Sequence, residues 1–219
     1  MRRFAAVLAL MLAVTPLFGQ SFTADQILGK LDEKAKVFTS MQASVKHQLN
    51  SYGTPGPEES GSLAMTSSKG DLRVMFDIKQ PTPVKQSIVK GRAVRYFVED
   101  NSYQEMKVDP KNELLSFLLL GFGTPAATIK KGYKAEVKAS EKINGANTAV
   151  LALTSIDVST EEFPLITLWL DPATWTPVQL RVGRNGKKYD EYKCSGVELN
   201  GKVADSVFDL KMKSGAKKQ

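Results

Sequence analysis

Residues 71–108 decide the fold and read DLRVMFDIKQPTPVKQSIVKGRAVRYFVEDNSYQEMKV. Apolar and polar residues alternate along this stretch, and turn-forming residues interrupt the alternation at 80–83, 90–92 and 100–101. A period of two is typical of a strand with one buried face, and Pro, Gly and Asn are typical of the turns between strands. The stretch therefore predicts four consecutive antiparallel strands, at about 72–78, 84–90, 93–99 and 102–108.

The same pattern continues on both sides of this stretch. Alternation predicts further strands at about 42–49, 61–68, 133–139, 147–154, 165–170, 177–183 and 187–195. The total is about eleven strands. A long series of hairpins with one polar face favours an antiparallel sheet that curls on itself.

Three segments have helical patterns instead. Thr23 to Gln26 has the spacing of a capping box, and the apolar residues that follow predict an amphipathic helix over about 24–39. Residues 114–122 read LLSFLLLGF, apolar nearly all round a helix that glycines would end. Thr124-Pro125 fits the start of a short helix over about 125–131.

A curled sheet of this size needs an apolar filling. Eight strands enclose an interior that side chains just fill, and eleven enclose more. The residues expected to face inward are Val, Ala, Leu, Met and Phe, so the filling is a helix, a ligand or both. Segment 114–122 is the expected lid, and an apolar lid over an apolar bowl describes a site for hydrocarbon chains. The alternative is a closed sandwich with a dry core and no cavity.

The two ends of the chain differ from the body. Arg2 and Arg3 precede an apolar run over 4–14, which is too short to span a bilayer and predicts a signal peptide over 1–20. We therefore expect export to the periplasm without stable membrane insertion. A single domain is expected over 21–213, followed by a basic, flexible tail over 214–219.

Composition and charge exclude several classes of function. The net charge is +7, but without Arg2 and Arg3 the chain has 28 basic and 23 acidic residues, and four of the basic ones lie in the last nine positions. The body is thus nearly neutral, and no nucleic-acid partner is expected. No hydrolase, phosphate-loop or dinucleotide motif occurs, so no catalytic residue, cofactor or metal is expected. The one histidine, His47, is interpreted as a satisfied or surface residue, and Cys194 as a buried or edge thiol.

The order of elements resembles the LolA family, the periplasmic carriers of outer-membrane lipoproteins. The resemblance covers nearly the whole chain after the signal peptide. It rests on Ala24–Leu28, Gly61-x-Leu63, Lys90-Gly-Arg92 with Val94-x-Tyr96, Leu114–Gly121, and Ile166–Asp171 with Thr174-Trp175-x-Pro177. It implies a mainly β fold with a few helices: an incomplete, unclosed antiparallel β-barrel of about 11 strands, with helices covering the apolar cavity.

The resemblance also implies a function. The cavity would hold the acyl chains of a lipoprotein, which an inner-membrane lipoprotein-releasing ABC transporter loads and an outer-membrane receptor accepts. The carrier is expected to be a monomer without a cofactor. The expected lid residues are Leu114, Leu115, Phe117, Leu118, Leu119 and Phe122. The expected cavity wall is Leu63, Met65, Val74, Phe76, Ile88, Val94, Tyr96 and Leu168.

One departure from the family leaves other functions open. Family members often carry Arg-Pro after the second strand, where the Arg holds the lid closed; the matching residues here are Lys69 and Gly70. Lysine lacks the planar fork of arginine, so Lys69 is only a candidate latch. The alternatives are a periplasmic lipid or lipoprotein sensor that regulates an envelope stress response, and a general lipid-binding protein. A lipid-modifying enzyme would have only His47, Tyr96 or the acidic residues to use.

Overall fold

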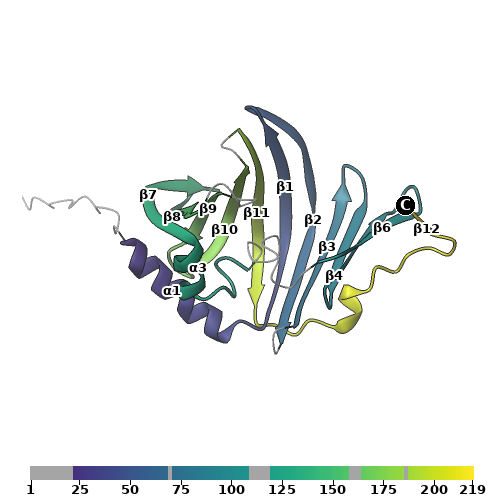
Figure 1. Cartoon of the computed structure of the whole chain (residues 1–219), viewed down its shortest axis with the longest axis horizontal. Helices are drawn as coiled ribbons and strands as arrows, with labels where there is room; N and C mark the ends of the chain where they lie inside the picture. The colour runs from purple at the N-terminus through teal and green to yellow at the C-terminus, as the bar shows by residue number, and fades with distance from the viewer. Residues whose placement is uncertain (1–21, 69–70, 109–118, 158–163, 185–186) are drawn as a thin grey trace, which may run out of the picture.

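The computed structural model describes residues 22–68, 71–108, 119–157, 164–184 and 187–219, so the expected signal peptide lies outside it (Figure 1). One twelve-stranded sheet, in the order β12-β6-β5-β4-β3-β2-β1-β11-β10-β9-β8-β7, carries the fold. The sheet curves strongly, and its end strands do not pair with each other (Figure 1). The prediction of a mainly β, incomplete barrel is confirmed.

The first eleven strands follow the predicted order, although β2 begins at Thr54 rather than at about 61, and β12 was not predicted. The strands are β1 (Ser40–Ser51), β2 (Thr54–Ser68), β3 (Asp71–Gln80), β4 (Val84–Val89), β5 (Arg92–Phe97), β6 (Ser102–Lys107), β7 (Tyr133–Ile143), β8 (Ala146–Ser155), β9 (Leu165–Asp171), β10 (Thr176–Arg184), β11 (Lys188–Leu199) and β12 (Lys217–Lys218). Strands β1 to β11 pair antiparallel, whereas β12 pairs parallel with β6.

Register across the sheet separates two faces. Opposite residues of an antiparallel pair lie on the same face, so Met41, Met65, Val74 and Ile88 form one continuous apolar row across β1 to β4. This row belongs to the main hydrophobic cluster, on the concave side of the sheet. The alternate residues lie on the convex side.

Two helices cover the β7–β9 half of the sheet (Figure 1). Helix α1 (Ala24–Val37) has the predicted capping box at Thr23 and buries Ile27, Leu28 and Leu31 in the main cluster. Helix α3 (Ala126–Gly132) buries Ile129. The Asp32 carboxylate accepts a hydrogen bond from the first amide of α3, which ties the two helices together. Within the described ranges, no helix is both long and apolar enough to cross a bilayer.

The last twenty residues, which we call the C-terminal segment (200–219), cover the convex face of β3 to β5. A short 3-10 helix, η1 (Asp205–Phe208), places Phe208 against Ala64 and Met75 in a second hydrophobic cluster. The Arg73 guanidinium lies 4.3 Å from the centre of the Phe208 ring. The Ser87 hydroxyl donates to the Phe208 carbonyl at 2.9 Å.

The end of this segment, where we expected a flexible tail, forms a short strand. Lys217 and Lys218 pair with Ser102 and Tyr103 of the edge strand β6. The Gln219 side chain adds a hydrogen bond to the Ser102 hydroxyl at 2.7 Å. Main-chain hydrogen bonds to an edge strand need no particular side chains, so the basic composition of the tail could not reveal this pairing.

Candidate functional site

The concave face is the apolar surface that sequence analysis singled out, and six of the eight expected wall residues share it. They are Leu63, Met65, Val74, Phe76, Ile88 and Leu168. Five of them are buried, and Phe76 is partly buried against them. These six residues thus form one apolar surface built from several strands, and their role as the wall of a ligand cavity stays a prediction.

Val94 and Tyr96 lie on the other face of the sheet. Val94 is opposite Ser87, and Ser87 is opposite Met75 of the convex cluster. The Tyr96 hydroxyl donates to Asn101 and accepts a hydrogen bond from the amide of Lys213 in the C-terminal segment. Both faces of β5 carry apolar residues because both are covered, so alternation alone could not show which face points to the cavity.

A tight turn, residues 119–123, closes over the wall. The amides of Phe122, Gly123 and Thr124 all donate to the Leu119 carbonyl, at 2.8–3.2 Å. Gly121 has a φ of +82°, and a Cβ there would overlap the Pro177 ring. Glycine is therefore needed both for the conformation of the turn and for its close approach to β10.

The turn places two large side chains on the concave face. Leu120 and Phe122 are 5% and 7% exposed and belong to the main cluster, and Phe122 packs against Phe38 with ring centres 6.5 Å apart. Leu119 is half-buried. The other expected lid residues, Leu114, Leu115, Phe117 and Leu118, and the candidate latch Lys69 lie outside the described residues.

Little space remains beneath the turn. Leu120 and Phe122 face Val45, Leu180 and Tyr192 across a cavity of about 20 Å³. That volume holds about one water molecule, whereas pockets for small ligands measure about 300–1,000 Å³. Under the turn, the described side chains of the protein fill the concave face almost completely.

The convex face offers a larger hollow of a different kind. A cavity of about 530 Å³ lies between the sheet and the C-terminal segment. Its lining includes Asp77, Lys85, Glu198, Asp209 and Lys211. Charged walls of both signs do not suit a hydrocarbon chain, because each charge would lose water on binding.

Cys194 lies in the wall of the small concave cavity. Burial raises the pKa of its thiol to about 11. The thiolate is the reactive form of cysteine, so this thiol is unsuited to nucleophilic chemistry at neutral pH. Cys194 is partly buried, and the expectation was a buried or edge thiol.

Beside the cavity, on the same face, His47 lies between two carboxylates. Its Nδ1 is 2.8 Å from Oε2 of Glu59 on β2, and its Nε2 is 2.8 Å from Oδ1 of Asp190 on β11. The ring stacks on Tyr192, with centres 4.6 Å apart. Burial alone would lower the pKa of His47, but the hydrogen bonds to Asp190 and Glu59 outweigh it and raise the pKa.

Sequence analysis expected a satisfied histidine but not its partners. Glu59 and Asp190 are 12 and 143 residues away from His47, and only the pairing of β1 with β2 and β11 brings them together. Among the described residues, no group of three His, Cys, Asp or Glu side chains is placed to hold a metal ion.

The fold occurs in solved structures of low sequence identity. An uncharacterized conserved protein from Thermus thermophilus aligns with a TM-score of 0.55 and 11% identity, over 90% of this chain and 98% of that chain. MucB aligns with a TM-score of 0.51 and 15% identity over 88% of this chain, which spans only 63% of MucB. A LolA superfamily protein from Nitrosomonas europaea aligns with a TM-score of 0.37 and 17% identity, over 86% of this chain and 98% of that chain.

Likeness at such low identity shows the fold and not the activity. No family model and no curated protein matches the sequence. At TM-scores above 0.5, this chain shares its fold with the Thermus protein and with MucB.

Proposed function

We propose that this LolA-like chain is a periplasmic carrier that holds the acyl chains of a lipoprotein against its concave face. The observation that supports the proposal is how this face is filled. Leu120 and Phe122 of the 119–123 turn lie on the apolar wall and leave a cavity of only about 20 Å³. A hydrocarbon chain can replace the apolar contacts of Leu120 and Phe122 with contacts of the same kind.

Replacement of one apolar contact by another suits a protein that must also release its cargo. Each buried methylene contributes about 0.8 kcal/mol, so several acyl chains in an empty apolar bowl would be held very tightly. When the chains first displace Leu120 and Phe122, the lost contacts of these residues reduce the net affinity. The 119–123 turn must then open more easily than the sheet, as segments that move on binding generally do.

The proposal extends to residues and partners that the structure does not describe. Leu114, Leu115, Phe117 and Leu118 would continue the lid, and Lys69 would be its latch. An inner-membrane lipoprotein-releasing ABC transporter would load the chain in the periplasm, and an outer-membrane receptor would accept its cargo.

Binding of a fluorescent triacylated lipopeptide tests the proposal. We expect saturable one-to-one binding to the purified chain, and transfer of the lipopeptide to vesicles. Leu63→Ala removes a wall residue and should weaken binding severalfold. Leu165→Ala is the matched control, since this leucine is 40% exposed and lies on the convex side of β9.

Three outcomes would count against the carrier. Absence of lipopeptide binding would exclude the proposed function. Equal competition by a phospholipid of the same chain length would favour a general lipid-binding protein. Recovery from the native host of a complex with a protein that carries no acyl chain would favour the sensor. For the lid, Leu118→Asp should change both binding and release, and unchanged rates would rule out its role there.

A further inference from the structure

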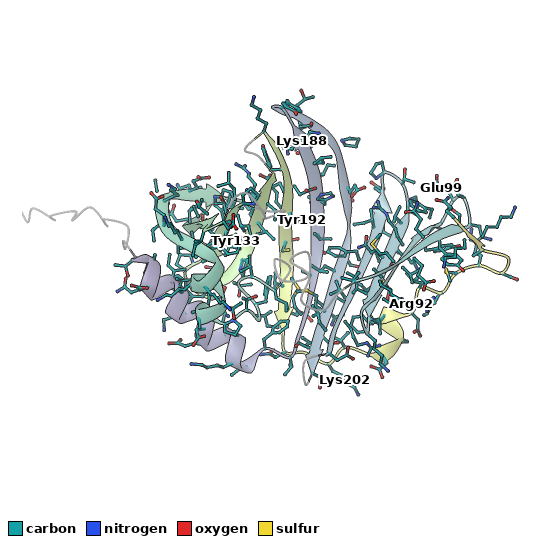
Figure 2. The ribbon with its side chains drawn as sticks, in the orientation of Figure 1. Arg92, Glu99, Tyr133, Lys188, Tyr192 and Lys202 are labelled. Carbon is teal, nitrogen blue, oxygen red and sulfur yellow. The ribbon has the colours of Figure 1, made fainter. Side chains whose placement is uncertain are left out.

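The His47 side chain joins three neighbouring strands beside the cavity. The ring lies on β1, and its two nitrogens contact Glu59 of β2 and Asp190 of β11 at 2.8 Å each. Its flat face stacks on Tyr192, which lines the cavity together with Cys194. Figure 2 shows Tyr192 in the middle of β11, while Lys188 of the same strand lies at the end of the β1–β2 hairpin.

The two short contacts fit a doubly protonated ring between two carboxylates. A carboxylate only accepts hydrogen bonds, so each ring nitrogen must carry a hydrogen to bond its partner. A neutral imidazole has one N–H, and its other nitrogen would then face a carboxylate oxygen lone pair to lone pair. The geometry fits an imidazolium between two ionised carboxylates, in line with the raised pKa of His47.

Three titratable groups contact the ring, and a lysine lies further along the same face of β11. Glu59, Asp190 and Tyr192 contact the ring, and the Tyr192 partner across the next strand is the apolar Leu180. Lys188 lies on the same face of β11, where its Nζ is 5.4 Å from the centre of the Tyr52 ring. Lys46 precedes His47 in the sequence, and Lys193 follows Tyr192. Both lysines point to the convex side and form ion pairs there, Lys46 with Glu58 at 2.7 Å and Lys193 with Glu191 at 3.1 Å.

We propose that His47 is a proton-dependent clamp at the rim of the cavity. With both ring protons in place it holds β1 to β2 and to β11. Loss of either proton releases one carboxylate and loosens the ring against Tyr192, a residue of the cavity wall. The clamp itself is inferred from this geometry. Its effect on an acyl chain in the cavity rests on the proposed function.

Nuclear magnetic resonance tests the protonation directly, because the chain contains one histidine. A long-range nitrogen–proton spectrum at pH 6.5 should show hydrogens on both ring nitrogens. The midpoint of the titration should lie above the ordinary value of about 6.5, and Asp190→Asn and Glu59→Gln should each lower it. A neutral ring at pH 6.5, or a midpoint that neither substitution moves, would overturn the proposal.

Amide hydrogen exchange tests the clamping. At pH 6, His47→Gln should speed exchange in 45–49, 57–61 and 189–194 by about tenfold relative to the unmodified chain, since hydrogen bonds between charged groups are lost. Above the titration midpoint of His47 the difference should shrink. Lys46→Gln breaks an ion pair on the opposite face, so its small effect should be the same at both pH values. A His47→Gln effect that does not depend on pH would contradict a proton-dependent clamp.

Release of the fluorescent lipopeptide separates the clamp from the carrier. Release should become faster as the pH rises through the midpoint in the unmodified chain, and should be fast and independent of pH in His47→Gln. If the chain shows pH-dependent exchange but binds no lipopeptide, the clamp is supported and the proposed carrier function is excluded. If the chain binds lipopeptide but releases it equally fast at all pH values, His47 does not control release.

Discussion

Each face of this sheet has an apolar region that is covered by a segment outside the antiparallel strands, but the two covers are held differently. On the convex face, the C-terminal segment is fastened by polar contacts: Arg73 bonds Asp205, Ser87 bonds the Phe208 carbonyl, and the segment ends paired to β6. On the concave face, Leu120 and Phe122 of the 119–123 turn are held by apolar packing, and the turn hydrogen-bonds to itself.

The difference indicates which cover is permanent. A directional hydrogen bond to a buried partner is costly to break, because the partner is left unsatisfied. An apolar contact can be replaced by any other hydrocarbon of suitable shape. The convex cover is therefore expected to unfold with the sheet, and the concave cover to detach alone. Each of the following substitutions tests this contrast, in order of decreasing effect on the free energy of unfolding.

Truncation of one aromatic side chain in each cover should give unequal losses. Phe208→Ala is expected to lower the free energy of unfolding by about 3–5 kcal/mol, the usual cost for a buried Phe. Phe122→Ala should cost about 1–2 kcal/mol, because a segment that opens locally cannot lose more than its own opening free energy. Urea denaturation of both variants measures this. Equal losses would mean that the two covers are equally integral to the fold.

Gly121→Ala should open the concave cover without removing any apolar group. A Cβ at this position overlaps the Pro177 ring, and the φ of +82° is strained for alanine. We expect a stability loss of about 1–2 kcal/mol and a severalfold faster uptake of the fluorescent lipopeptide. The matched control is Gly145→Ala, which has a φ of +83° but no atom within 4 Å of the added Cβ. If both variants take up lipopeptide at the unmodified rate, the turn does not gate the cavity.

Stability should also depend on pH through His47, and the sign follows from the direction of its pKa shift. A group whose pKa is higher in the folded than in the unfolded chain stabilises the fold fully below the unfolded value of about 6.5. This contribution is lost as the pH rises through the folded value, so the free energy of unfolding should fall with increasing pH above about 6.5.

Urea denaturation at a series of pH values measures this fall in the free energy of unfolding. His47→Gln should lack this part of the pH dependence. The effect should be smaller than that of Gly121→Ala, because the His47 side chain is partly exposed and its charges are screened by water. A pH profile identical to that of the unmodified chain would show that another group is responsible.

The sequence predicted the parts of this contrast that depend on local patterns. The strands, the capping box of α1 and six wall residues follow from alternation and spacing, which are local properties. The face of Val94 and Tyr96 did not follow, because the C-terminal segment that buries them lies more than 100 residues further along the chain. The His47 cluster was missed for the same reason: strand pairing, and not spacing, brings Asp190 beside the ring.

The reaction rate of the Cys194 thiol measures access to the space beneath the 119–123 turn, and this probe needs no substitution that would change the stability of the protein. Because burial raises its pKa from 9.0 to about 11, its thiolate is about a hundredfold rarer at pH 8 than that of an ordinary cysteine. Its reaction with a maleimide should be slower by at least this factor, since the turn also restricts access. Gly121→Ala should speed the reaction and Gly145→Ala should not, while bound lipopeptide should slow it again in Gly121→Ala. A rate that none of these changes affects would place the thiol outside the space that the turn covers, and the contrast between the two covers would then lose its functional meaning.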